Sequence, residues 1–144
     1  MEKEKINIVW LKRDIRSQDH IAFHKADECE EPFIAVYIVE PSIHLLSKDI
    51  SERHLKFIKE SLIELRKTLS EFKIPLLVFK SEAVSVFQIL NKEFNIKTVL
   101  SHEESGTVTT WKRDRNIKKQ LSTLNIKWIE FPTNGVLRGI SDRK

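Results

Sequence analysis

Cysteine is nearly absent from this chain of 144 residues, in which Cys29 is the only one. A single cysteine excludes an intramolecular disulfide and a cysteine metal cluster within one chain. This usage suits the reducing cytoplasm, where we expect the protein to lie. Long apolar runs are also missing, and the charged amino terminus does not have the pattern of a signal peptide. We therefore expect no membrane partner.

Glycine is also scarce, with only three residues, at positions 106, 135 and 139. The sequence has no glycine-rich phosphate loop after its first strand-like run, no P-loop and no Gly-x-Ser-x-Gly nucleophile motif. Its five histidines are not spaced as metal ligands, except that His20 and His24 fall one turn apart on a predicted helix. Because no third ligand lies near that pair, we do not expect a metal site.

The composition, 40% hydrophobic and 32% charged, is that of a globular protein, and the length predicts one domain. The net charge of +4 is small and spread along the chain, which favours a solvated surface over a nucleic-acid patch. The three tryptophans are expected to pack in the core or at interfaces, namely Trp10, Trp111 and Trp128.

One predicted helix near the carboxyl end is strongly basic. We interpret its cations as a solvated face, with an internal ion pair between Asp114 and Lys118. The cations are Lys112, Arg113, Arg115, Lys118 and Lys119.

Five segments have the apolar, β-branched or aromatic content of buried strands. They are residues 6–11, Phe33–Val39, 76–79, 98–100 and Lys127–Phe131. Helical patterns alternate with them. The first runs from a cap at Asp19 to about Asp27, the second from a cap at Ser51, and the others cover about 83–94 and 108–124. The second helix carries an amphipathic stripe of Leu55, Ile58, Leu62, Leu65, Leu69 and Phe72.

Alternating strands and helices indicate βαβ units and a parallel sheet. Right-handed crossovers then place helices on both faces. The sequence therefore predicts an α/β fold, a doubly wound sheet of five parallel strands.

Charged residues gather directly after the first predicted strand. They are Lys12, Arg13, Asp14, Arg16 and Asp19. The carboxyl ends of parallel strands form the ligand edge of an α/β sheet, so the cluster lies where a ligand would bind. Two interpretations stay open. The arginines order the turn by pairing with the two carboxylates, or an arginine offers its planar donor fork to a carboxylate, phosphate or ring oxygen of a ligand.

A second cluster, His102, Glu103 and Glu104 before Gly106, follows the fourth predicted strand. Adjacent carboxylates repel each other if buried, so the two glutamates are either solvated or part of a functional site. In the first case they favour the amino end of the following helix through its dipole. A third segment, at 134–138, contains Gly135 and is expected to end the sheet.

These three segments resemble the amino-terminal domain of the DNA photolyase/cryptochrome family. The family pattern is an aromatic-rich strand, then Arg-x-Asp-Leu-Arg, then Asp-Asn. This chain matches at Arg13 or its neighbour Lys12, and at Asp14, Ile15 in place of Leu, Arg16 and Asp19. It departs at His20, where Asn is usual. The resemblance covers about residues 6–143 and implies the strand order 3-2-1-4-5. It also implies a core at about 6–133 within a single domain 1–144, and an exit at 134–144 toward a helical FAD-binding domain that this chain lacks.

What the resemblance implies about function concerns the parent protein. That protein would bind FAD in its helical domain and use light to split pyrimidine dimers or to signal, so no catalytic residue is expected in this chain. The amino-terminal domain would hold an antenna chromophore, such as a reduced folate, a deazaflavin or FMN. The candidate cofactor-binding residues are Arg13, Asp14, Glu40, His102, Glu103 and Glu104.

The expected partner is the FAD-binding helical domain, and only the parent protein would bind DNA. Without that domain an apolar surface is exposed, so the isolated chain is expected to dimerise. Two other classes stay open. One is a stand-alone small-ligand or nucleotide-binding protein of universal-stress or electron-transfer-flavoprotein type, and the other is a structural or partner-binding module.

Overall fold

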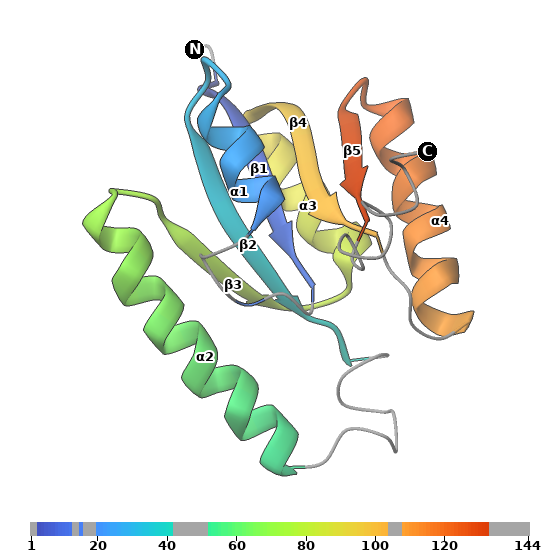
Figure 1. Ribbon diagram of the computed structural model, residues 1–144. Helices are drawn as coiled ribbons and strands as arrows, with labels where there is room; N and C mark the ends of the chain where they lie inside the picture. The colour runs from blue at the N-terminus through green and yellow to red at the C-terminus, as the bar shows by residue number, and fades with distance from the viewer. Residues whose placement is uncertain (1–2, 13–14, 16–19, 42–51, 104–107, 133–144) are drawn as a thin grey trace, which may run out of the picture.

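The computed structural model describes residues 3–12, 15, 20–41, 52–103 and 108–132. Strands and helices alternate along this part of the chain (Figure 1). In chain order they are β1 (Lys5–Leu11), α1 (Ile21–Asp27), β2 (Phe33–Val39), α2 (Glu52–Glu71), β3 (Leu76–Lys80), α3 (Ala83–Glu93), β4 (Asn95–His102), α4 (Val108–Thr123) and β5 (Lys127–Phe131).

The five strands form one parallel sheet in the order β3-β2-β1-β4-β5. This confirms the predicted doubly wound fold. β1 lies at the centre, with Val9 in register with Ala35 of β2 and with Leu100 of β4. β4 is longer than the predicted 98–100, because Ile96 stands between the polar residues Asn95 and Lys97 and this part of the strand lacks the unbroken apolar run of β1, β2 and β3.

Helices cover both faces of the sheet (Figure 1). α1 and α2 pack over one face, against Val9, Leu11, Ala35, Tyr37 and Leu100. α3 and α4 cover the other face, where Trp10 is fully buried and meets Phe87 edge to face at 5.2 Å between ring centroids. Alternate residues of β1 thus serve different layers, as the period of two in a strand requires.

α1 begins one residue later than predicted. Its N-cap is His20, whose Nδ1 accepts a hydrogen bond of 3.3 Å from the backbone N–H of Phe23. Asp19, the predicted cap, lies outside the described residues. Histidine is an uncommon N-cap, so the preference for Asp, Asn, Ser and Thr pointed to the wrong residue.

α2 buries the predicted stripe at Ile58, Leu62, Leu65 and Leu69. The expectation that Phe72 continues this stripe is wrong, since α2 ends at Glu71 and Phe72 is 68% exposed. The helix ends in a Schellman turn, with the Ile74 N–H bonded to the Leu69 carbonyl at 3.0 Å. Lys73 stands at the left-handed position of that turn, with φ of 61°.

No helix of the described residues is long and apolar enough to cross a lipid bilayer.

Replacing Lys73 by glycine should raise the free energy of unfolding by about 0.5–1 kcal/mol, because glycine takes a left-handed conformation without the steric cost of a Cβ. Urea denaturation measures the change. Lys73→Ala is the matched control, since it removes the same ammonium group but keeps the Cβ. An equal gain from both substitutions would contradict the backbone explanation.

Candidate functional site

The carboxyl ends of β1, β2 and β4 meet at one edge of the sheet. The chain leaves β1 toward β2 and β3, then returns to β4 on the other side of β1. The crevice between β1 and β4 is therefore the topological switch point, where ligands bind in open α/β sheets. Lys12, Glu40 and Glu103 directly follow the three strands at this edge.

Four charged side chains form a chain of ion pairs at this edge. Lys12 Nζ lies 2.8 Å from Asp114 Oδ2, and Arg113 Nε donates to Asp114 Oδ1 at 2.7 Å. Arg113 also donates from its guanidinium to Glu40 Oε1. Glu40 Oε2 accepts a hydrogen bond of 3.2 Å from the Ala83 N–H, the first residue of α3. The strand ends of β1 and β2 are thereby tied to both α3 and α4.

The network is largely removed from water. The Glu40 and Lys12 side chains are 1% and 5% exposed, and those of Arg113 and Asp114 are 12% and 14% exposed. Two positive and two negative charges balance, so the group is formally neutral. Charges that leave water need this kind of pairing, because an unpaired buried charge is strongly destabilising.

Two tryptophans form the apolar side of the same site. Lys12 Nζ lies 4.5 Å from the ring centroid of Trp10 and 5.1 Å from that of Trp128, and the Arg113 guanidinium lies 5.0 Å from Trp10. Trp128 also donates its indole N–H to Ser101 Oγ at 2.9 Å. Cation–π attraction thus adds to the ion pairs and holds both cations beneath the sheet edge.

Burial raises the pKa of the Glu40 carboxyl above its ordinary value, and Arg113 with the Ala83 N–H offsets part of that rise. Burial likewise raises the pKa of Glu130 on β5, although Lys12 acts in the opposite direction. Glu103 adds to the rise at Glu130 by repulsion, so carboxylates from two neighbouring strands share this edge.

His102 lies on the other face of the sheet from Glu40. It is buried, and its ring meets that of His20 at 4.8 Å between centroids. Glu103 is half-buried, and its N–H bonds to the Phe131 carbonyl at 2.7 Å, which fixes the start of the loop after β4. In the described part of the chain, no three His, Cys, Asp or Glu side chains are placed to hold a metal ion.

Three of the six predicted cofactor residues are thus placed: Glu40, His102 and Glu103. All three stand at the carboxyl edge, and of these Glu40 joins the network. Arg13, Asp14 and Glu104 lie outside the described residues, as does the predicted exit segment from 134 on.

The interpretation of α4 as a wholly solvated basic helix is wrong at Arg113 and Asp114. Asp114 bonds to Lys12 and Arg113 instead of the predicted Lys118. A signal was present in the sequence. Residues 113 and 114 stand four and three positions before the buried Ile117, on the same side as Leu121, so helical periodicity turns them inward.

The expectation for the tryptophans holds for Trp10 and Trp128, which pack with their rings 5.7 Å apart. Trp111 does not lie in the core, because it is 58% exposed on the outer face of α4. Packing at an interface, the other part of that expectation, stays a prediction for Trp111.

A small cavity of about 220 Å³ adjoins the network between α3 and α4. Glu40, Glu82, Lys112 and Arg113 contribute its charged lining. Pockets for drug-sized ligands measure roughly 300–1,000 Å³. The cavity is therefore smaller than a pocket that holds a whole ligand of that size.

The family model of DNA photolyase matches residues 7–141. The chain belongs to the DNA photolyase family. The deoxyribodipyrimidine photo-lyase of Vibrio cholerae is 30% identical over 142 residues, which cover 92% of this chain and 29% of that protein. Cryptochrome DASH of Synechocystis is 29% identical over 126 residues, covering 83% of this chain and 25% of that protein.

Solved structures agree with this assignment. A Synechocystis cryptochrome has a TM-score of 0.83 at 24% identity, covering 92% of this chain and 28% of its own. An archaeal photolyase from Sulfolobus tokodaii, described with two FAD molecules and a novel light-harvesting cofactor, has a TM-score of 0.77 at 26% identity. That match covers 88% of this chain and 29% of the archaeal one. The chain thus spans between 18% and 29% of the length of the curated relatives it matches.

Replacing Arg113 by methionine should lower the free energy of unfolding by about 3–5 kcal/mol, because Glu40 stays buried without its charged partner. Urea denaturation measures the loss. Adding Glu40→Gln to Arg113→Met should cost less than the sum of the two single changes, since the pair is coupled. Arg115→Met, on the exposed face of the same helix, should stay within about 0.5 kcal/mol of the parent. Additive losses would contradict the pairing.

The raised pKa of Glu40 also predicts a pH dependence. The folded protein holds the Glu40 proton more tightly than the unfolded chain does, so this group stabilises the fold at low pH. Its contribution is lost as pH rises from the ordinary glutamate pKa through the raised folded value. Urea midpoints measured across that pH window should fall less steeply with pH in Glu40→Gln than in the parent. Glu130→Gln should remove only the part of the pH dependence that comes from Glu130. An unchanged slope in Glu40→Gln would count against the raised pKa.

Proposed function

We propose that this chain is the amino-terminal α/β domain of a photolyase-like flavoprotein and that it holds, or provides the scaffold for, an antenna chromophore. In the parent, a helical domain would bind both FAD and DNA. Light would then drive pyrimidine-dimer repair or signalling. This domain alone would not be catalytic. Its single cysteine fits a cytoplasmic parent.

The observation that carries this proposal is the buried network of Lys12, Asp114, Arg113 and Glu40 at the switch point of the sheet. It fixes strand ends and helices in one arrangement around a tryptophan pair, in a chain that belongs to the DNA photolyase family. Such rigid support is what a bound chromophore needs, because energy transfer depends on a fixed position. The archaeal relative, described with a light-harvesting cofactor, supports the same assignment.

The ring system would lie across the strand ends, at the side chains predicted from the sequence. A carboxylate such as Glu103 accepts parallel N–H bonds from a pterin, and an arginine such as Arg13 pairs with an anionic tail. The 220 Å³ cavity beside Lys112 and Arg113 would take a polar group. A reduced folate, a deazaflavin and FMN all offer such groups.

Incubating the protein with each of the three chromophores should give a bound absorption band shifted from that of the free compound. Glu103→Gln and Arg13→Gln should each weaken binding by about tenfold, which corresponds to one lost charge-assisted hydrogen bond. Fluorescence titration measures the affinities. Glu31→Gln, at the amino end of β2 and thus at the opposite edge of the sheet, is the matched control and should bind normally.

Failure of all three compounds to bind a protein that circular dichroism shows to be folded would contradict the antenna role. It would favour the alternative of a partner-binding α/β module, for which the exposed Trp111 is the specific observation.

A further inference from the structure

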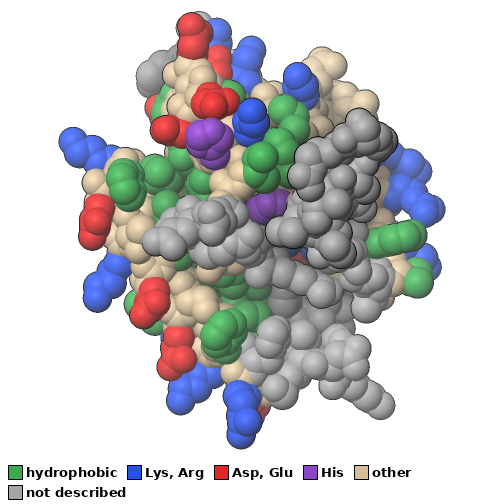
Figure 2. All heavy atoms as spheres, viewed as in Figure 1, with side chains coloured by type: hydrophobic (Ala, Val, Ile, Leu, Met, Phe, Trp, Pro, Cys, Tyr) green, Lys and Arg blue, Asp and Glu red, His purple; other side chains and the backbone are tan. Residues whose placement is uncertain are grey.

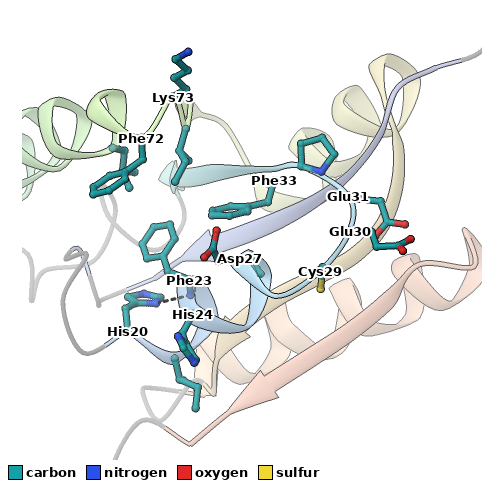
Figure 3. Close-up of a pocket in the computed structure, with 15 residues that line it drawn as sticks. His20, Phe23, His24, Asp27, Cys29, Glu30, Glu31, Phe33, Phe72 and Lys73 are labelled. Atoms are coloured by element: carbon teal, nitrogen blue, oxygen red, sulfur yellow. Dashed lines mark hydrogen bonds between the residues drawn. The ribbon is translucent and has the colours of Figure 1, made fainter.

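A second concave surface lies away from the network, between α1 and the carboxyl end of α2 (Figure 3). We call it the α1–α2 groove, and it has a volume of about 1110 Å³. Three phenylalanines from three elements face into it: Phe23 of α1, Phe33 of β2 and Phe72 after α2 (Figure 3). The rings of Phe23 and Phe33 are 6.1 Å apart, so the groove has an aromatic floor.

Phe72 is the least covered of the three, with 68% of its surface in water. The Schellman turn at Lys73 holds its backbone beside the groove. Burying a phenylalanine side chain contributes about 1.5–3 kcal/mol. A partner that binds in the groove and covers Phe72 would gain this free energy without a rearrangement of the backbone.

The rim of the α1–α2 groove is acidic. Asp27, Glu30 and Glu31 line it, and Lys73 is the only lysine or arginine among the described lining residues. Three carboxylates against one ammonium make the groove negative. A complementary partner therefore brings an aromatic side chain flanked by cations.

The outer face of α4 has this composition. Val108 and Trp111 are exposed to 70% and 58%, and exposed cations surround them. The cations are Lys112, Arg115, Lys118 and Lys119. Asp114, the only carboxylate of α4, is turned inward to Lys12. Figure 2 shows basic and hydrophobic side chains together at the right-hand edge of the molecule, where Figure 1 places α4.

We propose that the outer face of α4 of one copy docks into the α1–α2 groove of a second copy. Within one chain the two surfaces cannot meet, because α1 and α2 cover one face of the sheet and α4 the other. Trp111 would fill the space between Phe23, Phe33 and Phe72. Lys112 and Arg115 would pair with the acidic rim.

Physical grounds favour this pairing over separate solvation of the two surfaces. Tryptophan and arginine dominate the binding energy of protein interfaces when they enter a desolvated pocket. Opposite charges speed encounter and fix orientation. Since the two patches differ, the contact is heterologous, and each associated copy still carries one free patch of each kind unless a ring closes.

The test is sedimentation velocity of the 144-residue protein from about 1 to 100 µM, a range that covers the affinities of transient complexes. The expected result is an average mass that rises with concentration and falls when salt is raised from about 0.05 to 0.5 M, because screening weakens the charge contacts. Trp111 emission should shift to shorter wavelength with assembly. A monomer throughout this range at low salt overturns the proposal.

Two variants identify the surfaces. Trp111→Ala with Arg115→Glu alters only the α4 face, and Phe72→Asp with Glu31→Lys alters only the groove. Each alone should associate at least about tenfold more weakly. Their equimolar mixture should form a 1:1 dimer that grows no further, since one intact groove meets one intact α4 face. A mixture that stays monomeric overturns the heterologous contact.

Phe57→Asp is the matched control, since Phe57 is 63% exposed on α2 but does not line the groove. It should associate as the parent does. Loss of association in this control would place the contact elsewhere on α2. Polyanion binding is the competing use of α4, so a single-stranded oligonucleotide that binds α4 while the parent stays monomeric also overturns the proposal. Glu31 is half-buried and the other altered side chains are exposed, and circular dichroism checks that each variant is folded.

Discussion

The constraint on which the rest of this structure depends is the burial of four charges at the carboxyl edge of the sheet. Lys12 and Glu40 leave the ends of two neighbouring strands, and neither can be held in the interior without a partner. Arg113 and Asp114 supply those partners from one helix turn, so α4 can sit on the sheet in only one rotation and one register. Glu40 extends the same constraint to α3 through the first N–H of that helix.

The network also explains why the two faces of the sheet differ. The α3–α4 face carries the ion pairs and the Trp10–Trp128 contact, and it is therefore rigid near the switch point. The α1–α2 face is held by aliphatic packing along α2 and by histidine ring contacts at the short α1. Between those helices it leaves the aromatic groove. A ligand edge supported by charges and a groove supported by apolar packing are two separate properties of one domain.

Much of the fold was predictable from the sequence, because β1, β2 and β3 each contain an unbroken apolar or aromatic run and α2 has a regular stripe. The strand order came from the family resemblance, which the sheet confirms. The site was less predictable. Arg113 and Asp114 look like members of a charged helix until their spacing from Ile117 is considered, and their partners Glu40 and Lys12 lie 73 and 102 residues away, respectively. Local patterns carry no information on such distant pairs.

Trp111 is a second residue whose environment could not be predicted from residue type alone. Tryptophan is largely buried on average, so the residue type favoured packing. The exposure of Trp111 is instead decided by its position on α4. Trp111 stands four residues before Arg115 and seven before Lys118, so it lies on the side of α4 that carries these exposed cations. The burial of Arg113 and Asp114 therefore fixes which side of α4 faces outward. The ion pairs that hold the ligand edge thus also determine that an aromatic and basic stripe is presented to solvent, so any substitution that rotates α4 would change both surfaces together.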